Sequence, residues 1–290
     1  MAESSLFDAG FRAQCAALAR KLSGRLRRGT AAGGRSRSEG RVEFREHRPY
    51  VEGDDPRDID WNALARLDAW VTKARSQDEA PELLVVVDRS GSMGPSGGRQ
   101  DVVARRCAAA AGYLALAAGG RVSLGVPSGN GAVAVVSERQ GIAAIPRWWG
   151  DVERLVPPAD TLDAASVAAW PPSGPRRALL VVTDALSDVA AARLPAAMAT
   201  ASGGATLLLV LAHEPPSGAG SAVLRGLEGE PDLPVDDVAL LAPKVDALRV
   251  AHVEDVRAAC ARRGVRCAPL VGDEPFTAGI LRWVVGTGPT

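Results

Sequence analysis

The sequence has few aromatic residues and no net charge, and both shortages exclude a class of partner. Phe, Trp and Tyr make up 4% of the 290 residues, too few for the stacking platform of a protein that binds single-stranded nucleic acid. Lys and Arg number 34, as do Asp and Glu, so no overall field attracts nucleic acid or an anionic membrane. The composition therefore predicts no nucleic-acid partner.

Cysteines are also scarce, and their spacing indicates the compartment. The four cysteines form neither a C-x-x-C pair nor a framework of disulfides: Cys15, Cys107, Cys260 and Cys267. Scattered free cysteines suit a reducing cytosol, where they act as buried apolar side chains. We therefore expect a cytoplasmic protein without disulfides.

Long hydrophobic runs are missing as well. The longest apolar run, residues 107–118, is shorter than the roughly 18 residues that indicate a membrane span. Residues 1–14 lack a basic stretch followed by an apolar one, which a secretory signal requires. We expect neither a transmembrane segment nor export.

What the chain does contain, from residue 83 onward, is short apolar runs that alternate with helical patterns. This alternation is typical of βαβ units and a parallel sheet. Strands are predicted at 83–87, 121–126, 133–136, 178–183, 205–211 and 265–271. Helices are predicted at 101–118, 146–155, 161–169, 189–201, 245–263 and 275–285. The predicted fold class is α/β, a doubly wound, mostly parallel sheet with helices on both faces, preceded by a helical and β N-terminal extension.

Two segments depart from this alternation. The turn-rich link 127–131 is too short for a helical crossover, so the strands that flank it are predicted to form an antiparallel hairpin at one edge. Residues 222–237 contain Pro231 and Pro234, which cannot lie in a central strand. This segment is either a recognition element on an edge excursion or a solvated connection.

The first 40 residues have a different character. Apolar residues recur there at spacings of three or four, which predicts one stripe on a helix: Phe7, Phe11, Cys15, Leu18, Leu22 and Leu26. We expect this helix to dock on the protein's own core, with a partner groove or a membrane surface as the alternative. The stretch that follows is rich in Arg, Gly and Glu and is predicted to be a flexible, solvated linker.

A candidate metal site begins where the first strand of the sheet ends. Asp88, Ser90 and Ser92 follow the apolar run 83–87, so one carboxylate and two hydroxyls converge where the backbone curls. Oxygen donors are the ligands of hard divalent cations, and Mg²⁺ suits a partly filled protein cage. The alternative is a simple turn or helix cap, which Asp and Ser also favour.

This Asp-x-Ser-x-Ser pattern resembles the metal-ion-dependent adhesion site of von Willebrand factor A domains. The resemblance implies two further ligands, a threonine before a helix and an aspartate that ends a later strand, and Thr161 and Asp184 match them. Asp88 and Asp184 both follow the carboxyl ends of strands, where open parallel sheets bind ligands. The predicted metal ligands are therefore Asp88, Ser90, Ser92, Thr161 and Asp184, with Mg²⁺ as the ion and Mn²⁺ as the alternative.

Residues 41–80 predict a strand, a turn, a short helix and a second strand. Residues 53–61 read Gly-Asp-Asp-x-Arg-x-Ile-Asp-Trp. Ahead of an A-type domain, this motif resembles the domain of unknown function 58 family, the von Willebrand A-like proteins associated with MoxR ATPases, over residues 34–285. The predicted organisation is a helix and basic linker at 1–40, this cap segment at 41–80 and an A-like domain at 81–288 with an excursion at 222–237.

The resemblance implies a non-catalytic, metal-dependent protein-binding module. Its expected partner is a MoxR-type AAA+ ATPase, a client protein or both, with an acidic partner residue completing the Mg²⁺ shell. The chain lacks G-x-x-x-x-G-K-[ST], so ATP is not expected to bind here. The alternative is a magnesium-dependent phosphatase-like hydrolase with Asp88 as nucleophile, although Ser90 stands where such enzymes carry a second acid.

Overall fold

The structure is a computed structural model, and it divides the chain into two compact units, residues 36–80 and the rest. It describes residues 6–26, 47–49, 64, 70–73, 82–94, 98–128, 132–155, 167, 177–186, 188–202, 204–212, 219–224 and 231–286. In the smaller unit, β1 (His47–Pro49) pairs antiparallel with β2 (Val71–Lys73). The predicted turn at 53–56 lies outside the described residues.

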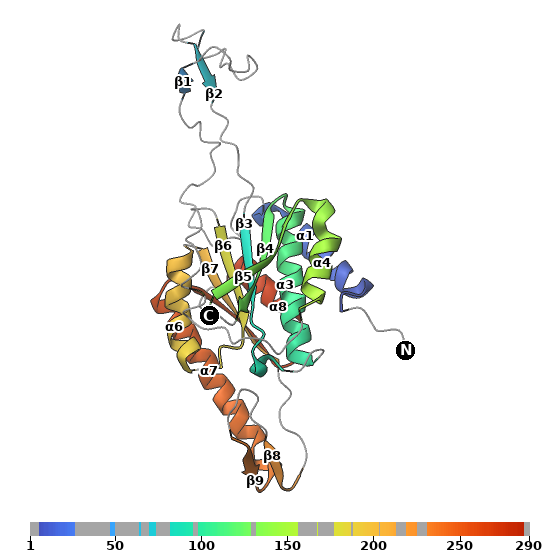
Figure 1. Ribbon diagram of the computed structural model, residues 1–290, viewed down its shortest axis with the longest axis vertical. Coiled ribbons are helices and arrows are strands. Elements are labelled where there is room, and N and C mark those ends of the chain that lie inside the picture. The colour runs from blue at the N-terminus through green and yellow to red at the C-terminus, as the bar shows by residue number, and fades with distance from the viewer. Residues whose placement is uncertain are drawn as a thin grey trace. The chain divides into compact units, whose positions relative to one another are not determined.

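The larger unit is built on a six-stranded sheet with the strand order β10-β7-β6-β3-β4-β5 (Figure 1). Its strands are β3 (Glu82–Val87), β4 (Arg121–Ser128), β5 (Ala132–Gln140), β6 (Arg177–Thr183), β7 (Gly204–Leu211) and β10 (Arg266–Val271). All neighbours pair in parallel except β4 and β5, which form an antiparallel hairpin. The predictions of a mostly parallel α/β sheet and of an edge hairpin are therefore confirmed.

Helices cover both faces of this sheet, as predicted (Figure 1). One face packs against α1 (Ala9–Leu26), α3 (Arg99–Ala117), α4 (Ile145–Glu153) and α8 (Phe276–Val285). The other packs against α6 (Asp188–Ala201) and α7 (Ala242–Arg262). Of the helix predicted at 161–169, only Val167 is described, and it is helical and buried.

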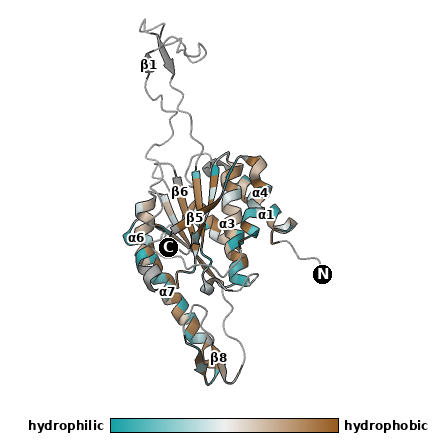
Figure 2. Ribbon diagram, viewed as in Figure 1, coloured by the Kyte–Doolittle hydropathy of each residue, from teal (hydrophilic) through white to brown (hydrophobic). Residues whose placement is uncertain are grey.

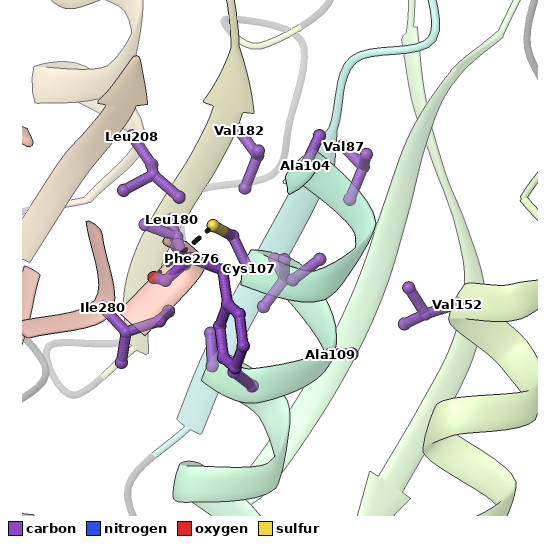
Figure 3. Close-up of a cluster of buried hydrophobic side chains, with 14 of the residues drawn as sticks. Val87, Ala104, Cys107, Ala109, Val152, Leu180, Val182, Leu208, Phe276 and Ile280 are labelled. Atoms are coloured by element: carbon purple, nitrogen blue, oxygen red, sulfur yellow. Dashed lines mark hydrogen bonds between the residues drawn. The ribbon is translucent and has the colours of Figure 1, made fainter. Parts of the chain in front are cut away.

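Buried strands divide their side chains between two cores because successive residues point to opposite faces. Val85 and Val87 of β3 belong to the first core, whereas Leu84 and Val86 belong to the second. In the first core, Cys107 of α3 lies near Phe276, whose carbonyl oxygen accepts a weak hydrogen bond from its Sγ at 3.9 Å (Figure 3). Burial raises the pKa of the Cys107 thiol, so this cysteine is an apolar core residue, as predicted.

The N-terminal helix docks on the protein itself. Five of the six stripe residues are described, and all five are buried: Phe7, Phe11, Cys15, Leu18 and Leu22. The ring centroids of Phe11 and Phe276 are 4.9 Å apart, and Asp8 caps the helix by accepting from the Phe11 N–H at 2.7 Å. The prediction of self-docking is therefore confirmed.

Beyond the main sheet, β8 (Ala222–Leu224) and β9 (Leu233–Val235) pair as a separate antiparallel ribbon. A short 3-10 helix, η5 (Val238–Leu240), joins this ribbon to α7. The strands of the main sheet are predominantly hydrophobic, whereas α7 alternates hydrophobic and hydrophilic residues along its length (Figure 2). Across the described ranges, no helix has both the length and the hydropathy needed to cross a bilayer.

Candidate metal centre

The centre lies where β3 and β6 end side by side. Val87 pairs with Val182, and the Asp88 N–H continues the ladder by donating to the Val182 carbonyl oxygen at 2.9 Å. The register therefore places Asp88 beside Thr183 and Asp184. Because β4 lies on one side of β3 and β6 on the other, the strand order reverses here, which is the usual ligand-binding position of an open α/β sheet.

Asp88 is held rigidly and is almost completely buried. Its Oδ1 accepts from the Ser90 N–H at 2.9 Å, and its Oδ2 accepts from the Thr183 hydroxyl at 2.6 Å. Asp88 is only 5% exposed. This burial is the main reason that the pKa of Asp88 is raised to about 6, and the charge of Asp184 is the second. Hydrogen bonds from Thr183 and from the backbone and side chain of Ser90 lower the pKa but do not offset the burial.

Ser90, Ser92 and Asp184 form one hydrogen-bonded chain. The turn of η3 (Gly91–Met93) curls the backbone after Ser90, and the two serine Oγ atoms lie 3.0 Å apart. Ser92 Oγ then donates to Asp184 Oδ1 at 3.3 Å, across 92 residues of sequence. Four of the five predicted ligands therefore lie together, whereas Thr161 lies outside the described residues.

Two residues that the sequence did not single out support Asp184, and a third supports Asp88. Gln100 Nε2 donates to Asp184 Oδ2 at 3.0 Å, while Gln100 Oε1 accepts from the Ala212 N–H at 2.8 Å. His252 of α7 places its Nε2 2.9 Å from the Asp184 carbonyl oxygen. Thr183 bridges Asp88 to the Ala185 N–H. No local sequence pattern identifies these three residues, because their contacts join distant parts of the chain.

The backbone after Asp184 is strained. Ala185 has φ of 49°, the left-handed region that non-glycine residues rarely adopt, and it is buried. Such a conformation costs of order 1 kcal/mol and persists only where the surroundings enforce it. The Leu186 N–H donates to Asp184 Oδ1 at 3.2 Å, so the strained turn holds the carboxylate in place.

The donors at this centre fit a hard divalent cation. They are two carboxylates and two serine hydroxyls, and hard cations select such oxygen ligands. Within the described part of the chain, no group of three or more His, Cys, Asp and Glu could hold a metal, so a cation here would depend on the hydroxyls. Because the charge of Asp184 disfavours ionisation of Asp88, a bound cation would relieve a repulsion that is built into the fold.

A family model described as "Protein of unknown function DUF58" matches residues 46–218. The chain belongs to this family. The matched region covers β1, β2 and the strands that carry Asp88 and Asp184, but it ends before α7 and His252.

Two solved structures resemble this DUF58 protein. One is an aerotolerance-related membrane protein from Bacteroides fragilis NCTC 9343 with multiple mutations to serines, which is 14% identical with a TM-score of 0.44. The other is the conserved hypothetical protein BatB from Bacteroides thetaiotaomicron, which is 11% identical with a TM-score of 0.42. Each match covers 71% of this chain and 100% of the other. No curated protein matches the chain.

Proposed function

We propose that this DUF58 protein is a non-catalytic protein-binding module with a von Willebrand factor A-like metal site. Asp88, Ser90, Ser92 and Asp184 would hold Mg²⁺, or Mn²⁺, with Thr161 as the fifth ligand. The observation that carries the proposal is the hydrogen-bonded chain from Ser90 through Ser92 to Asp184, beside the buried carboxylate of Asp88.

The chemistry of the site follows from this arrangement. The two serine hydroxyls bond to each other, and that of Ser92 also donates to Asp184; both would turn their oxygen lone pairs toward the cation. The ion would also keep Asp88 ionised despite its burial. Mg²⁺ retains ligands that the protein does not supply, so an acidic side chain of a partner completes the shell.

The partner in this proposal is a MoxR-type AAA+ ATPase, a client protein or both, with the chain acting as an adaptor or co-chaperone in the cytoplasm. Two helices contact Asp184, α3 through Gln100 and α7 through His252. Occupation of the cation by a partner carboxylate would therefore bias the placement of both helices, which is how a local ligand produces a change at a distance.

Two measurements test the proposal. Mg²⁺ is expected to raise the Tm of the full chain, by an amount equivalent to about 2.7 kcal/mol at a hundredfold excess over Kd. Asp88→Asn and Ser92→Ala should lose this shift, whereas the exposed control Asp255→Asn, on α7, should keep it. Capture of a purified MoxR-type AAA+ ATPase should require Mg²⁺ and should disappear with EDTA or with Asp88→Ala.

Two results would contradict the proposal. One is a Tm shift with Mg²⁺ that persists in both site variants, because the cation would then bind elsewhere. The other is Mg²⁺-dependent hydrolysis of a generic phosphate ester that Asp88→Ala abolishes, because Asp88 would then be a nucleophile rather than a ligand.

A further inference from the structure

One end of α7 projects beyond the sheet and forms an arm (Figure 1). We define the apolar arm as β8, β9, η5 and residues 242–251 of α7. Its parts are tied together, because the Val238 N–H donates to the Gly220 carbonyl oxygen at 3.0 Å and Asp237 Oδ1 accepts from the Ala239 N–H at 3.0 Å. The arm is therefore an ordered element of the larger unit.

The arm rises from the edge of the sheet that carries the metal centre. Since α7 returns the chain to the amino end of β10, its own first residues lie at the carboxyl edge, where Asp88 and Asp184 are. His252 marks the level of the centre, because it contacts the Asp184 carbonyl oxygen at 2.9 Å. The ten residues before His252 rise 1.5 Å each, so the arm reaches about 15 Å beyond the centre.

The arm exposes large apolar side chains. Six of them are Val223, Leu224, Leu233, Leu240, Leu248 and Val250. Leu233 is 58% exposed and Leu248 is 69% exposed, whereas Val256 and Cys260, in the later part of the same helix, are fully buried. Exposed apolar side chains gathered on one element, rather than scattered singly, indicate a surface that contacts another molecule.

The charge of the arm selects the kind of partner. The described residues 219–224 and 231–251 contain four acidic and two basic residues, although the whole chain is neutral. Asp237 caps η5 and Asp246 pairs with Arg249, while the exposed Asp232 and Asp236 form no ion pair with any described residue. A surface of this kind repels an anionic membrane and complements a partner with Lys or Arg around an apolar patch.

We propose that the arm is a second docking surface for the protein that the metal centre binds. The partner presents an acidic residue to the cation and, about 15 Å away, an apolar surface bordered by basic side chains. This inference rests on the proposed function, and it explains how the protein would distinguish one partner from others. A single carboxylate occurs on almost every protein, so a metal contact alone cannot choose a partner, whereas two linked contacts multiply in affinity and in discrimination.

The test uses the full chain in Mg²⁺ and a purified MoxR-type AAA+ ATPase as the probe. The arm variant Leu233→Ser with Leu248→Ser replaces two exposed residues, so it should fold normally and keep its Tm shift with Mg²⁺. Its Kd for the ATPase should rise by about tenfold or more, since truncation of anchoring side chains weakens interfaces to this extent.

The matched control is Ile142→Ser. Ile142 is 66% exposed, and it follows the end of β5 that pairs with the start of β4, at the opposite edge of the sheet. This variant should bind within about twofold of the wild type, because a surface change outside an interface has little effect. Light scattering tests whether the wild type and the variants dimerise, and flotation with anionic vesicles tests whether they bind a membrane.

The outcomes separate the two proposals. An arm variant that binds as well as the control, while Asp88→Ala abolishes binding, overturns the arm and supports the metal centre. Binding that depends on the arm but not on Mg²⁺ overturns the proposed function and supports the arm as a docking surface. The arm variant could instead lose dimerisation or vesicle binding while its ATPase binding stays unchanged. That result overturns the proposal that the arm docks the ATPase. No capture by the wild type overturns both.

Discussion

The two faces of the main sheet are covered in different ways. Four helices cover the first face, and its core contains large aromatic side chains: Phe7, Phe11, Trp148, Phe276 and Trp283. Among the described residues, α6, α7 and the helical residue Val167 pack on the second face, and its buried cluster is aliphatic apart from Met198 and Cys260. The first face thus has an aromatic core beneath four helices, whereas the described core of the second face is aliphatic and one of its helices, α7, continues past the sheet.

This difference bears directly on the candidate metal centre, because each face supplies one support for Asp184. The first face contributes Gln100, which is buried and bonded at both ends of its amide. The second contributes His252, which is only partly buried. A rigid support from one face and an exposed helix from the other suit a site that must stay ordered and still meet a partner.

The largest effect is expected for Gly112→Ala on the first face. A methyl group at Gly112 would overlap the Trp148 indole, which is fully buried and donates its Nε1–H to the Ala109 carbonyl oxygen at 3.0 Å. Overpacking at such a contact should cost about 3 kcal/mol in the free energy of unfolding, measured with urea. The control Ala247→Leu, on the exposed part of α7, should change it by less than about 0.5 kcal/mol. Equal urea midpoints for Gly112→Ala and Ala247→Leu would contradict the conclusion that the core of the first face is tightly packed.

The next effect compares the two supports of Asp184. Gln100→Leu removes the acceptor of the buried Ala212 N–H and the donor to Asp184 Oδ2, so it should cost about 2 kcal/mol of stability. His252→Leu removes one contact at a partly buried site and should cost about 1 kcal/mol or less. Thermal and urea unfolding of both variants measure the difference. A larger loss for His252→Leu would reverse the assigned roles of the faces.

A smaller effect is expected for the ion pair between Glu274 and Arg282 of α8, on the first face. Glu274 accepts from Arg282 and from the Val271 N–H, and the hydrogen bond from Arg282 is the main reason that the pKa of Glu274 lies below its ordinary value of 4.5. A lowered pKa adds stability at neutral pH that is lost as the pH falls below the ordinary value and through the lowered one.

Glu274→Gln should therefore reduce the free energy of unfolding at pH 7 by at most about 1 kcal/mol, because the pair is partly exposed. The gap between variant and wild type should narrow as the pH falls below 4.5 and through the lowered pKa of Glu274, because the carboxyl group is then protonated in the unfolded and finally also in the folded state. Urea unfolding at several pH values measures it. A gap that is independent of pH would show that packing, not charge, is responsible.

The smallest effect on stability is expected on the arm. Leu248→Ser should change the free energy of unfolding by less than about 0.5 kcal/mol, because Leu248 is exposed. Met198→Ala, in the buried core of the same face, should cost about 2 kcal/mol. Urea unfolding of the pair shows whether the arm contributes to the fold. A large loss for Leu248→Ser would mean that its side chain is buried in solution.

Much of the fold was predictable because its signals are local. Apolar runs bounded by turns predicted the six strands of the main sheet, and the short link after β4 predicted the antiparallel hairpin. The spacing of Phe7, Phe11 and Cys15 predicted a helix with one buried stripe. The predicted start of α3, residue 101, lies two residues after the observed start at Arg99.

The candidate site was predictable only in part. Asp88, Ser90 and Ser92 are close in sequence, and Asp184 could be placed because parallel strands end at one edge. The contacts of Gln100 and His252 with Asp184 join residues 84 and 68 positions apart, and no local pattern encodes them. The role of Thr161 and the identity of the cation remain predictions.

The sequence by itself determined the elements, the parallel sheet and the chemical types of the residues at its carboxyl edge, since propensity and periodicity act over a few residues. Only the tertiary structure decided which side chains support Asp184 and which part of α7 is buried. Burial depends on what packs against a residue from distant parts of the chain. The apolar residues of α7 therefore became core near Val256 and exposed arm near Leu248.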